Sequence, residues 1–306
     1  MNIVSCRFRD HRHIGVVEGD AVVLPSLIEA WPFGSEEMLE LIGRADETLP
    51  YLRSCLATAP ERCRIGLDAI ALQAPIPRPP KNIMCLGWNY LEHVRESAAA
   101  LDRAPAPPEA PVVFTKAVTS INDPFGTIPF DPQLSQELDW EVELGVVIGR
   151  AGRGIPVEQA LHHVFGYLII NDISARDMQR RHRQFFLGKS LDGTCPMGPG
   201  IVTADEIPDP QNLGLRCRVN GVLKQDSNTR FQIFDVATVI SILSRGMTLE
   251  AGDIISTGTP SGVGFARTPP EFLRPGDEVE CEIDGLGRIA NPIGHPASRA
   301  RRSGPD

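Results

Sequence analysis

The chain lacks the patterns that identify several specialised classes of protein. Its 306 residues include seven cysteines, an odd number at wide spacings and without a Cys-x-x-Cys pair. A disulfide framework and a zinc site are both disfavoured, and a reducing compartment is expected. No apolar run approaches the roughly 18 residues that a membrane-spanning helix needs. The first ten residues also lack the apolar core of a secretory signal, so we expect a soluble, cytoplasmic protein.

Nucleotide and nucleic-acid binding are also poorly supported. Neither a Gly-x-Gly-x-x-Gly fingerprint nor a phosphate loop occurs. Acidic residues outnumber basic ones by 39 to 30, for a net charge of −9. This balance argues against nucleic acid or an anionic membrane as the main partner. The basic run Arg180–Arg183 is a local exception, and we interpret it as a solvated face.

Acidic residues at alternate positions mark the segment 139–148, whose sequence is DWEVELGVVI. Alternate residues of a strand point to the same face, so Asp139, Glu141 and Glu143 should project together. From Leu144 onward the segment is apolar on both faces, which indicates a strand entering a core. Carboxylates at the edge of a core repel one another and lose hydration unless a cation joins them. The segment predicts a divalent-metal site, with scattered acids on an exposed strand edge as the alternative.

Asp172 is a candidate third ligand for this site. It follows an apolar segment that ends in Asn171, as expected for a strand that places a polar side chain at the rim of a sheet. Three carboxylates without a suitable Cys or His form a hard-cation site. Mg²⁺ or Mn²⁺ is the expected ion, with Ca²⁺ as an alternative.

Three further features could carry chemistry. His93 and Glu96 lie three residues apart in a predicted helix, where a carboxylate could orient an imidazole as a general base. Lys189 lies among apolar and small residues and could neutralise an oxyanion. The glycine-rich segment 258–264 includes Thr259 and could hold a carboxylate. Taken alone, each feature is also explained by an ordinary structural or surface role.

Proline divides the chain into two expected units. Four of the six residues at 75–80 are proline, which keeps a backbone extended and stiff. We expect a small α/β N-terminal domain at 1–74, this linker at 75–80, a catalytic domain at 81–294 and a disordered tail at 295–306.

Many short strands and few helices are expected. In the small domain, strands are predicted at 3–8, 14–18 and 21–24, and helices at 36–42 and 46–56. In the larger domain, helices are predicted at 90–101, 157–163 and 174–181, and strands at 81–86, 112–114, 137–148, 165–171, 200–203, 215–219, 254–257 and 278–283. This order is α+β and strand-rich, without the regular alternation of a doubly wound sheet.

The order of these motifs resembles the fumarylacetoacetate hydrolase family, in particular its bacterial-type acylpyruvate hydrolases and 2-hydroxyhepta-2,4-diene-1,7-dioate isomerases. The matching segments are GWNYLEHVRE (87–96), PVVFTKA (111–117), LDWEVELGVVIG (138–149), GYLIINDISARDMQ (166–179), FLGKSLDGTCPMGP (186–199) and GDIISTGTPSGVG (252–264). The resemblance implies a mixed β-sandwich roll that forms homodimers.

The resemblance also implies roles for individual residues. Glu141, Glu143 and Asp172 would bind Mg²⁺ or Mn²⁺, and Asp139 has no ligand role. The implied catalytic residues are His93, Glu96 and Lys189, and the implied substrate contacts are Lys116, Arg176, Gln179 and Thr259. Trp88 stands where many members have Arg or Leu, which leaves the substrate open.

The activity implied by this resemblance is metal-dependent hydrolysis of a C–C bond in a 2,4-dioxo acid of the acylpyruvate or fumarylpyruvate type, as in aromatic catabolism. His93, oriented by Glu96, would activate water, Lys189 would stabilise the oxyanion, and a metal-held enolate would leave. Decarboxylation, isomerisation or dehydration of a 2-oxo acid would pass through the same enolate and stays open. A non-catalytic metal-binding homologue is a further hypothesis.

Overall fold

Strand β11 (Val142–Ile148) lies inside the largest sheet of the protein, a computed structural model in which residues 1–28 and 31–295 are described. All seven residues of β11 are buried, as expected of a strand covered on both faces. It pairs antiparallel with β12 (Val164–Asn171) on one side and with β17 (Ile254–Ser256) on the other. A Cβ atom at Gly145 would lie 2.5 Å from Leu168 Cδ1 and 2.9 Å from Ile170 Cδ1, so the side chains of β12 fill the space above this glycine.

The large sheet crosses the whole molecule. Its main path has the order β4-β3-β2-β1-β14-β12-β11-β17-β6-β7. The other strands of this path are β1 (Asn2–Phe8), β2 (His11–Glu18), β3 (Ala21–Val23), β4 (Arg64–Gly66), β6 (Ile83–Gly87), β7 (Val112–Lys116) and β14 (Cys195–Thr203). Two short strands pair off this path, β5 (Ala71–Gln73) with β1 and β8 (Ile121–Asn122) with β14.

A second sheet completes the layered, strand-rich α+β fold that the sequence predicted. Its order is β16-β15-β18-β19-β9, with bounds β16 (Val222–Asn228), β15 (Gly214–Val219), β18 (Glu278–Ile283), β19 (Gly287–Gly294) and β9 (Ile128–Pro129). Alternate residues of β12 enter different cores. Tyr167 and Ile169 belong to the apolar cluster that includes β15 and β18, whereas Leu168 and Ile170 belong to a cluster shared with the N-terminal unit.

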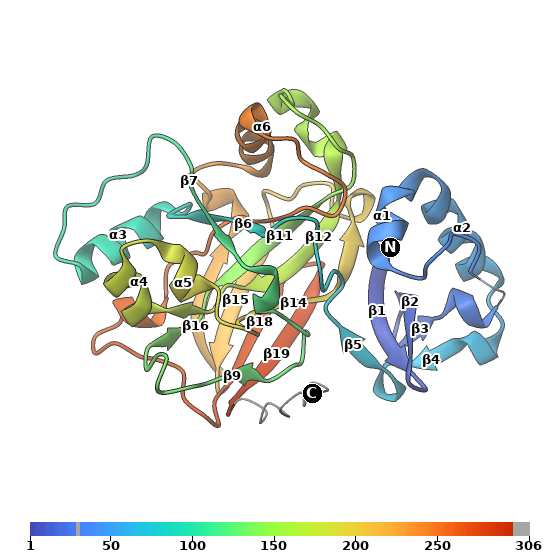
Figure 1. Cartoon of the computed structure of the whole chain (residues 1–306), viewed down its shortest axis with the longest axis horizontal. Coiled ribbons are helices and arrows are strands. Elements are labelled where there is room, and N and C mark those ends of the chain that lie inside the picture. Colours follow the sequence, from blue (N-terminus) through green and yellow to red (C-terminus); the bar gives the residue numbers. More distant parts are fainter. Residues whose placement is uncertain (29–30, 296–306) are drawn as a thin grey trace, which may run out of the picture.

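The helices lie around these sheets (Figure 1). They are α1 (Met38–Gly43), α2 (Ala45–Thr58), α3 (Leu91–Ala100), α4 (Arg176–His182), α5 (Phe185–Lys189) and α6 (Val236–Gly246). Helices α1 and α2 belong to the N-terminal unit, at the right of the view, while α3, α4 and α5 gather at the opposite end. That end holds the candidate site.

The N-terminal unit shares a sheet and a core with the rest of the chain. Strand β1 pairs with β14, and Ile3 and Leu41 pack in one cluster with Val147 and Ile170. Whether residues 1–74 and 81–294 behave as separate domains stays a prediction. The predicted tail falls almost wholly on residues 296–306, which lie outside the described residues.

Several predicted elements differ from the structure. The predicted strand at 137–148 is two strands, β10 (Leu138–Asp139) and β11. Strand β11 pairs with β12, whereas β10 pairs with the short strand β13 (Ser174–Ala175). The ladder breaks because the backbone N–H of Trp140 donates to the Asp139 side chain and that of Glu141 donates to the Asn171 side chain. The segment Val157–His163 is a 3₁₀ helix. The predicted helix at 174–181 starts at Arg176, after β13.

Candidate active site

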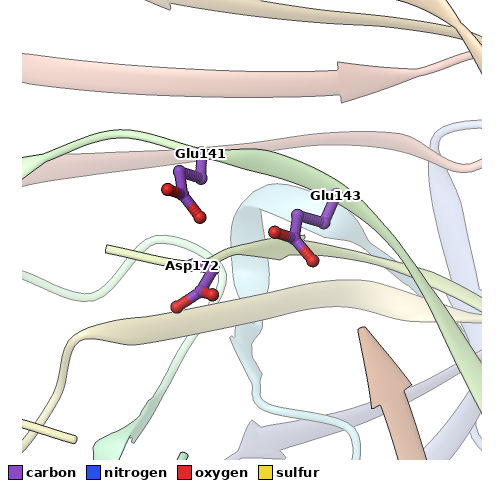
Figure 2. A group of neighbouring side chains, drawn as sticks. All are labelled: Glu141, Glu143 and Asp172. Atoms are coloured by element: carbon purple, nitrogen blue, oxygen red, sulfur yellow. The ribbon is translucent and has the colours of Figure 1, made fainter. Parts of the chain in front are cut away.

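Three acidic side chains meet where β11 and β12 run side by side. Glu143 lies in β11 opposite Ile170 of β12, and the backbone N–H of Asp172 donates to Glu141 O at 2.9 Å. One carboxylate oxygen from each of Glu141, Glu143 and Asp172 lies within 4.8 Å of the others, and all three residues are buried. Figure 2 shows the three carboxylates directed into a common space. The strand register thus brings together the three acids that the sequence predicted as metal ligands.

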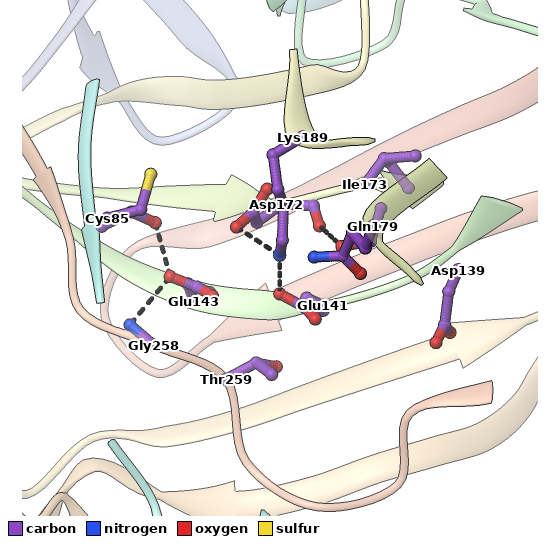
Figure 3. Close-up of polar contacts among 12 residues, drawn as sticks. Cys85, Asp139, Glu141, Glu143, Asp172, Ile173, Gln179, Lys189, Gly258 and Thr259 are labelled. Atoms are coloured by element: carbon purple, nitrogen blue, oxygen red, sulfur yellow. Dashed lines mark hydrogen bonds and ion pairs between the residues drawn. The ribbon is translucent and has the colours of Figure 1, made fainter. Parts of the chain in front are cut away.

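Asp139 does not join this group, contrary to the expected alternation. Because the strand breaks at Trp140, the Asp139 carboxylate accepts instead from the backbone N–H groups of Gly264, at 2.6 Å, and Phe265, at 3.1 Å. Arg176 Nε also donates to it at 2.8 Å. Figure 3 shows Asp139 apart from the other acids.

Two cationic side chains compensate Glu141 and Asp172. Lys189 Nζ lies 2.5 Å from Glu141 Oε2 and 2.7 Å from Asp172 Oδ2, as Figure 3 shows. Arg176 Nη2 donates to Glu141 Oε1 at 2.7 Å. Burial alone would raise the pKa of Glu141, but the attraction of Lys189 and Arg176 outweighs it and lowers this pKa to about 2.

Lys116 lies beside Asp172. Its Nζ is 2.8 Å from Asp172 Oδ1, and it donates a hydrogen bond to Ile173 O at 3.0 Å. Lys116 is fully buried and is not among the residues that line the cavity described below. Its predicted contact with substrate stays a prediction, while its contact with Asp172 is direct.

Glu143 differs from the other two acids in its partners. It is 1% exposed and accepts hydrogen bonds from two neutral donors, the Ser256 hydroxyl at 2.6 Å and the Gly258 backbone N–H at 2.8 Å. No Lys, Arg or His within the described chain forms an ion pair with it. Burial, together with repulsion from Asp172 and Glu141, raises its pKa well above the usual range.

The balance of charge fits a divalent cation. Four buried carboxylates, from Asp139, Glu141, Glu143 and Asp172, face three buried cations, from Lys116, Arg176 and Lys189. A buried carboxylate without a cationic partner is costly, and a dication bound by oxygen ligands would compensate it. The donor set contains oxygen alone, which suits Mg²⁺, Mn²⁺ or Ca²⁺.

His93 and Glu96 lie close to this centre on helix α3. His93 Nδ1 is 2.8 Å from Glu96 Oε1, and the Gly262 backbone N–H donates to Glu96 Oε2 at 2.9 Å. Glu96 therefore connects α3 to the 260–262 turn while it orients the imidazole. With Nδ1 engaged, Nε2 is the ring atom left for substrate or water.

A cavity of about 610 Å³ contains most of the predicted site. The predicted residues that line it are His93, Glu141, Glu143, Arg176, Gln179, Lys189 and Thr259. Gln179 accepts from Arg176 Nη1 at 3.1 Å. The Thr259 hydroxyl is already engaged, since it donates to Val142 O at 3.0 Å and accepts from Gln225 Nε2 at 2.8 Å.

The cavity also includes residues to which the sequence analysis gave no site role, together with Trp88, which it had connected with substrate choice. Trp88, Phe114 and Phe185 form an aromatic wall, with the Phe185 ring centroid 6.0 Å from that of Trp88 and 5.4 Å from that of Phe114. Ser97, Arg103 and Arg183 line it as well. The basic run at 180–183 was the available signal, and its position directly after the Arg176–Gln179 motif could have assigned it to the site.

Comparison with known proteins identifies the class. A family profile described as "Fumarylacetoacetate (FAA) hydrolase C-terminal" matches residues 82–294, and the chain belongs to this family. It is 50% identical to the oxaloacetate tautomerase YisK of Bacillus subtilis over 229 residues, and this aligned region covers 75% of each chain. It is 42% identical over 283 residues to the mitochondrial oxaloacetate tautomerase FAHD2B of Bos taurus, covering 92% of this chain and 87% of that protein.

Solved structures agree with this assignment. The fumarylacetoacetate hydrolase of Exiguobacterium antarcticum superposes with a TM-score of 0.83 at 40% identity, covering 97% of this chain and all of the other. The maleylpyruvate hydrolase of Sphingobium sp. SYK-6, solved with manganese(II) and pyruvate, superposes with a TM-score of 0.77 at 28% identity and the same coverage. In the part of the chain that the structure describes, no helix is long and apolar enough to span a membrane.

Proposed function

We propose that this protein is a divalent-metal-dependent enzyme that interconverts the keto and enol forms of a 2-oxo acid, with oxaloacetate as the leading substrate. The observation that carries the proposal is the cluster of Glu141, Glu143 and Asp172. Two of these acids line one cavity with His93, which Glu96 contacts through Nδ1. The names of the relatives that are 50% and 42% identical favour tautomerisation over the hydrolysis that the sequence first suggested.

Glu141, Glu143 and Asp172 would hold Mg²⁺ or Mn²⁺. When bound, such an ion acts as a Lewis acid toward a 2-oxo carboxylate and makes its C3 protons more acidic. The manganese in the maleylpyruvate hydrolase structure supports an ion of this kind.

The chain's own residues would move the proton. His93, held by Glu96 through Nδ1, takes a proton from C3 at Nε2, directly or through one water. The C3–H bond breaks, its electron pair forms the C2=C3 bond, and the π pair of the C2=O bond moves to the oxygen. That oxygen then takes a proton from solvent water to give the enol. Lys189, whose pKa is raised chiefly by Asp172 and Glu141 against the opposing effect of burial, stays protonated and stabilises the negative charge on that oxygen.

A second candidate is the predicted C–C hydrolase. The same dyad could activate a water for attack on a 2,4-dioxo acid, and the likeness to maleylpyruvate hydrolase favours this reading. Decarboxylation of a 2-oxo acid would use the same centre.

One panel separates these reactions. Purified protein with Mg²⁺ or Mn²⁺ is given the enol of oxaloacetate, acetylpyruvate and fumarylpyruvate, with ultraviolet absorbance followed for each and release of CO₂ measured for oxaloacetate. We expect rapid, EDTA-sensitive ketonisation of oxaloacetate and slow cleavage of the dioxo acids. Faster cleavage of a dioxo acid would replace the proposal with the hydrolase. Metal binding without turnover of any compound would favour the non-catalytic homologue.

The homodimer and the cytoplasmic location stay predictions. Light scattering coupled to gel filtration would test the first, with a mass near twice the 33.4 kDa of one chain as the expected result.

A further inference from the structure

The exposed mouth of the cavity carries a group of side chains that the proposed reaction does not use. Glu141 and Glu143 line the cavity and are buried, whereas Arg103 and Arg183 line the same cavity and are exposed. We infer that Ser97, Arg103 and Arg183 form a second anion subsite, which binds the distal carboxylate of a dicarboxylic 2-oxo acid. The inference rests on the proposed function and names its substrate class.

Ser97 supplies the first observation. It is 4% exposed and lines the cavity, yet its Oγ has no hydrogen-bond partner in the described chain. It lies one helical turn after His93, so the two side chains share the buried face of α3. A buried hydroxyl without a partner destabilises the protein, and a ligand oxygen in the cavity would remove that cost.

The backbone fixes the positions of the two arginines. Arg103 follows the end of α3, where its N–H donates to Ala98 O at 2.9 Å and Asp102 before it has a φ of 51°. Arg183 caps α4 with a φ of 60°, and its N–H donates to Gln179 O at 3.0 Å. Glycine is the usual residue in this left-handed cap, and a residue with a Cβ atom is strained there. The chain thus places a guanidinium at the mouth despite local strain.

Neither arginine is compensated by an acid. Within the described residues, no carboxylate lies within ion-pair distance of Arg103 or Arg183. Arg180 lines the cavity too, but its Nη2 donates to both carboxylate oxygens of Glu137, at 2.7 and 2.6 Å. Arg103 and Arg183 therefore have charge and donors free for a ligand, and a guanidinium matches a carboxylate in shape and charge.

Two unreactive acids can test the subsite without turnover. L-malate and L-2-hydroxybutyrate share a 2-hydroxy carboxylate for the metal, and differ in that malate ends in a carboxylate and 2-hydroxybutyrate in a methyl group. Calorimetry on the Mg²⁺-loaded protein would measure both affinities. We expect malate to bind at least about 10-fold more tightly, as charge-assisted hydrogen bonds to one more carboxylate predict.

The double variant R103Q/R183Q should weaken malate binding by about 10- to 100-fold and leave 2-hydroxybutyrate unchanged. Its matched control is R95Q/R181Q, which removes the same charge from exposed positions on the same two helices that do not line the cavity. Ser97→Ala should weaken malate binding without lowering the melting temperature, because no hydrogen bond within the protein is lost.

The outcomes distinguish the subsite from the reaction. An unchanged malate preference in R103Q/R183Q, or an equal loss in R95Q/R181Q, would overturn the subsite even if the enzyme enolises oxaloacetate. Loss of the preference in the test variant alone supports the subsite. If the wild-type protein then fails to enolise oxaloacetate, the proposed reaction is wrong, but the evidence for the anion subsite is unaffected.

Discussion

Among single residues, Glu143 has the least compensated charge in the cavity. Its hydrogen bonds come from a hydroxyl and a backbone N–H, and its neighbours include two more carboxylates. The metal is therefore expected to matter more to Glu143 than to Glu141, which already has Lys189 and Arg176.

Glu143→Gln tests this view. The amide keeps the shape and an acceptor for Gly258 N–H, and it removes the repulsion between carboxylates. We expect the metal-free variant to melt at or above the wild-type temperature, to lose the stabilisation by Mg²⁺, and to lose activity by at least about 100-fold. Thermal melts with and without Mg²⁺, with the rate of oxaloacetate ketonisation, are the measurements. A variant that keeps its response to Mg²⁺ would remove Glu143 from the ligand set.

Asp139 has a positioning role for Arg176. Both residues are buried, and Arg176 Nε donates to Asp139 while Nη2 donates to Glu141. Asp139→Asn should lower the free energy of unfolding by about 3–5 kcal/mol, because it leaves a buried guanidinium with one carboxylate fewer. The control is Glu137→Gln, which removes the partner of the exposed Arg180. It should lower the free energy of unfolding by only about 0–1 kcal/mol. Urea unfolding measures the free energy of unfolding of both variants. Equal decreases would show that the buried pair of Asp139 and Arg176 matters no more than the exposed one.

At the scale of elements, the 260–262 turn holds α3 against the sheet. The Gly262 N–H donates to Glu96, and Gly262 has a φ of 103°. A Cβ atom added there would lie 2.1 Å from Lys224 O, so alanine must displace the turn. Gly262→Ala should reduce kcat by about 10- to 100-fold through the misplaced His93, since general-base catalysis depends on position. Binding of Mg²⁺ should be retained.

The matched control is Gly276→Ala. Gly276 has a similar φ of 94°, but no atom lies within 4 Å of an added Cβ. Backbone strain alone should lower its stability by about 1 kcal/mol and leave kcat unchanged. Steady-state kinetics measure kcat for both variants. Equal values would show that the position of the 260–262 turn does not affect catalysis.

Local sequence predicted the elements whose pattern is strong. The apolar run after Glu143 predicted a doubly buried strand, and an apolar segment ending in Asn-Asp predicted the position of Asp172. Helix α6 was missed because Val236, Val239 and Ile240 favour strands, although Asp235 caps the helix by accepting from Thr238 N. Strand β19 was missed as well.

Tertiary contacts decided what local pattern could not. The break at Trp140 depends on the Asn171 side chain, which accepts from the backbone N–H of Glu141, thirty residues earlier. Alternation therefore wrongly grouped Asp139 with the other acids. The roles of His93, Glu96 and Lys189 came from family resemblance, since their spacing alone left structural roles open. The structure brings His93 and Lys189 into one cavity with two of the predicted ligands.

At the scale of the whole molecule, the shared sheet predicts cooperative unfolding. Strands β1 and β14 pair across the two units, and one apolar cluster contains residues of both. Trp31 reports on the small unit and Trp140 on the large one. Two variants each keep one of these tryptophans and carry phenylalanine at the other two of the three tryptophan positions. In each variant, the fluorescence transition in urea should coincide with the circular-dichroism transition. A separate, earlier Trp31 transition would support two independent domains.

The location of the two groups of site residues has an evolutionary consequence. Glu143 lies in β11, in the interior of the large sheet, whereas Arg103 and Arg183 follow the ends of short helices outside every strand. Substitutions at the helix ends can accumulate without disturbing strand pairing. A lineage can therefore change which acid it accepts while it inherits the cluster of buried acids intact. The proteins similar to this chain are named as a tautomerase, a hydrolase and an isomerase. Such a variety of activities is what this arrangement of site residues permits.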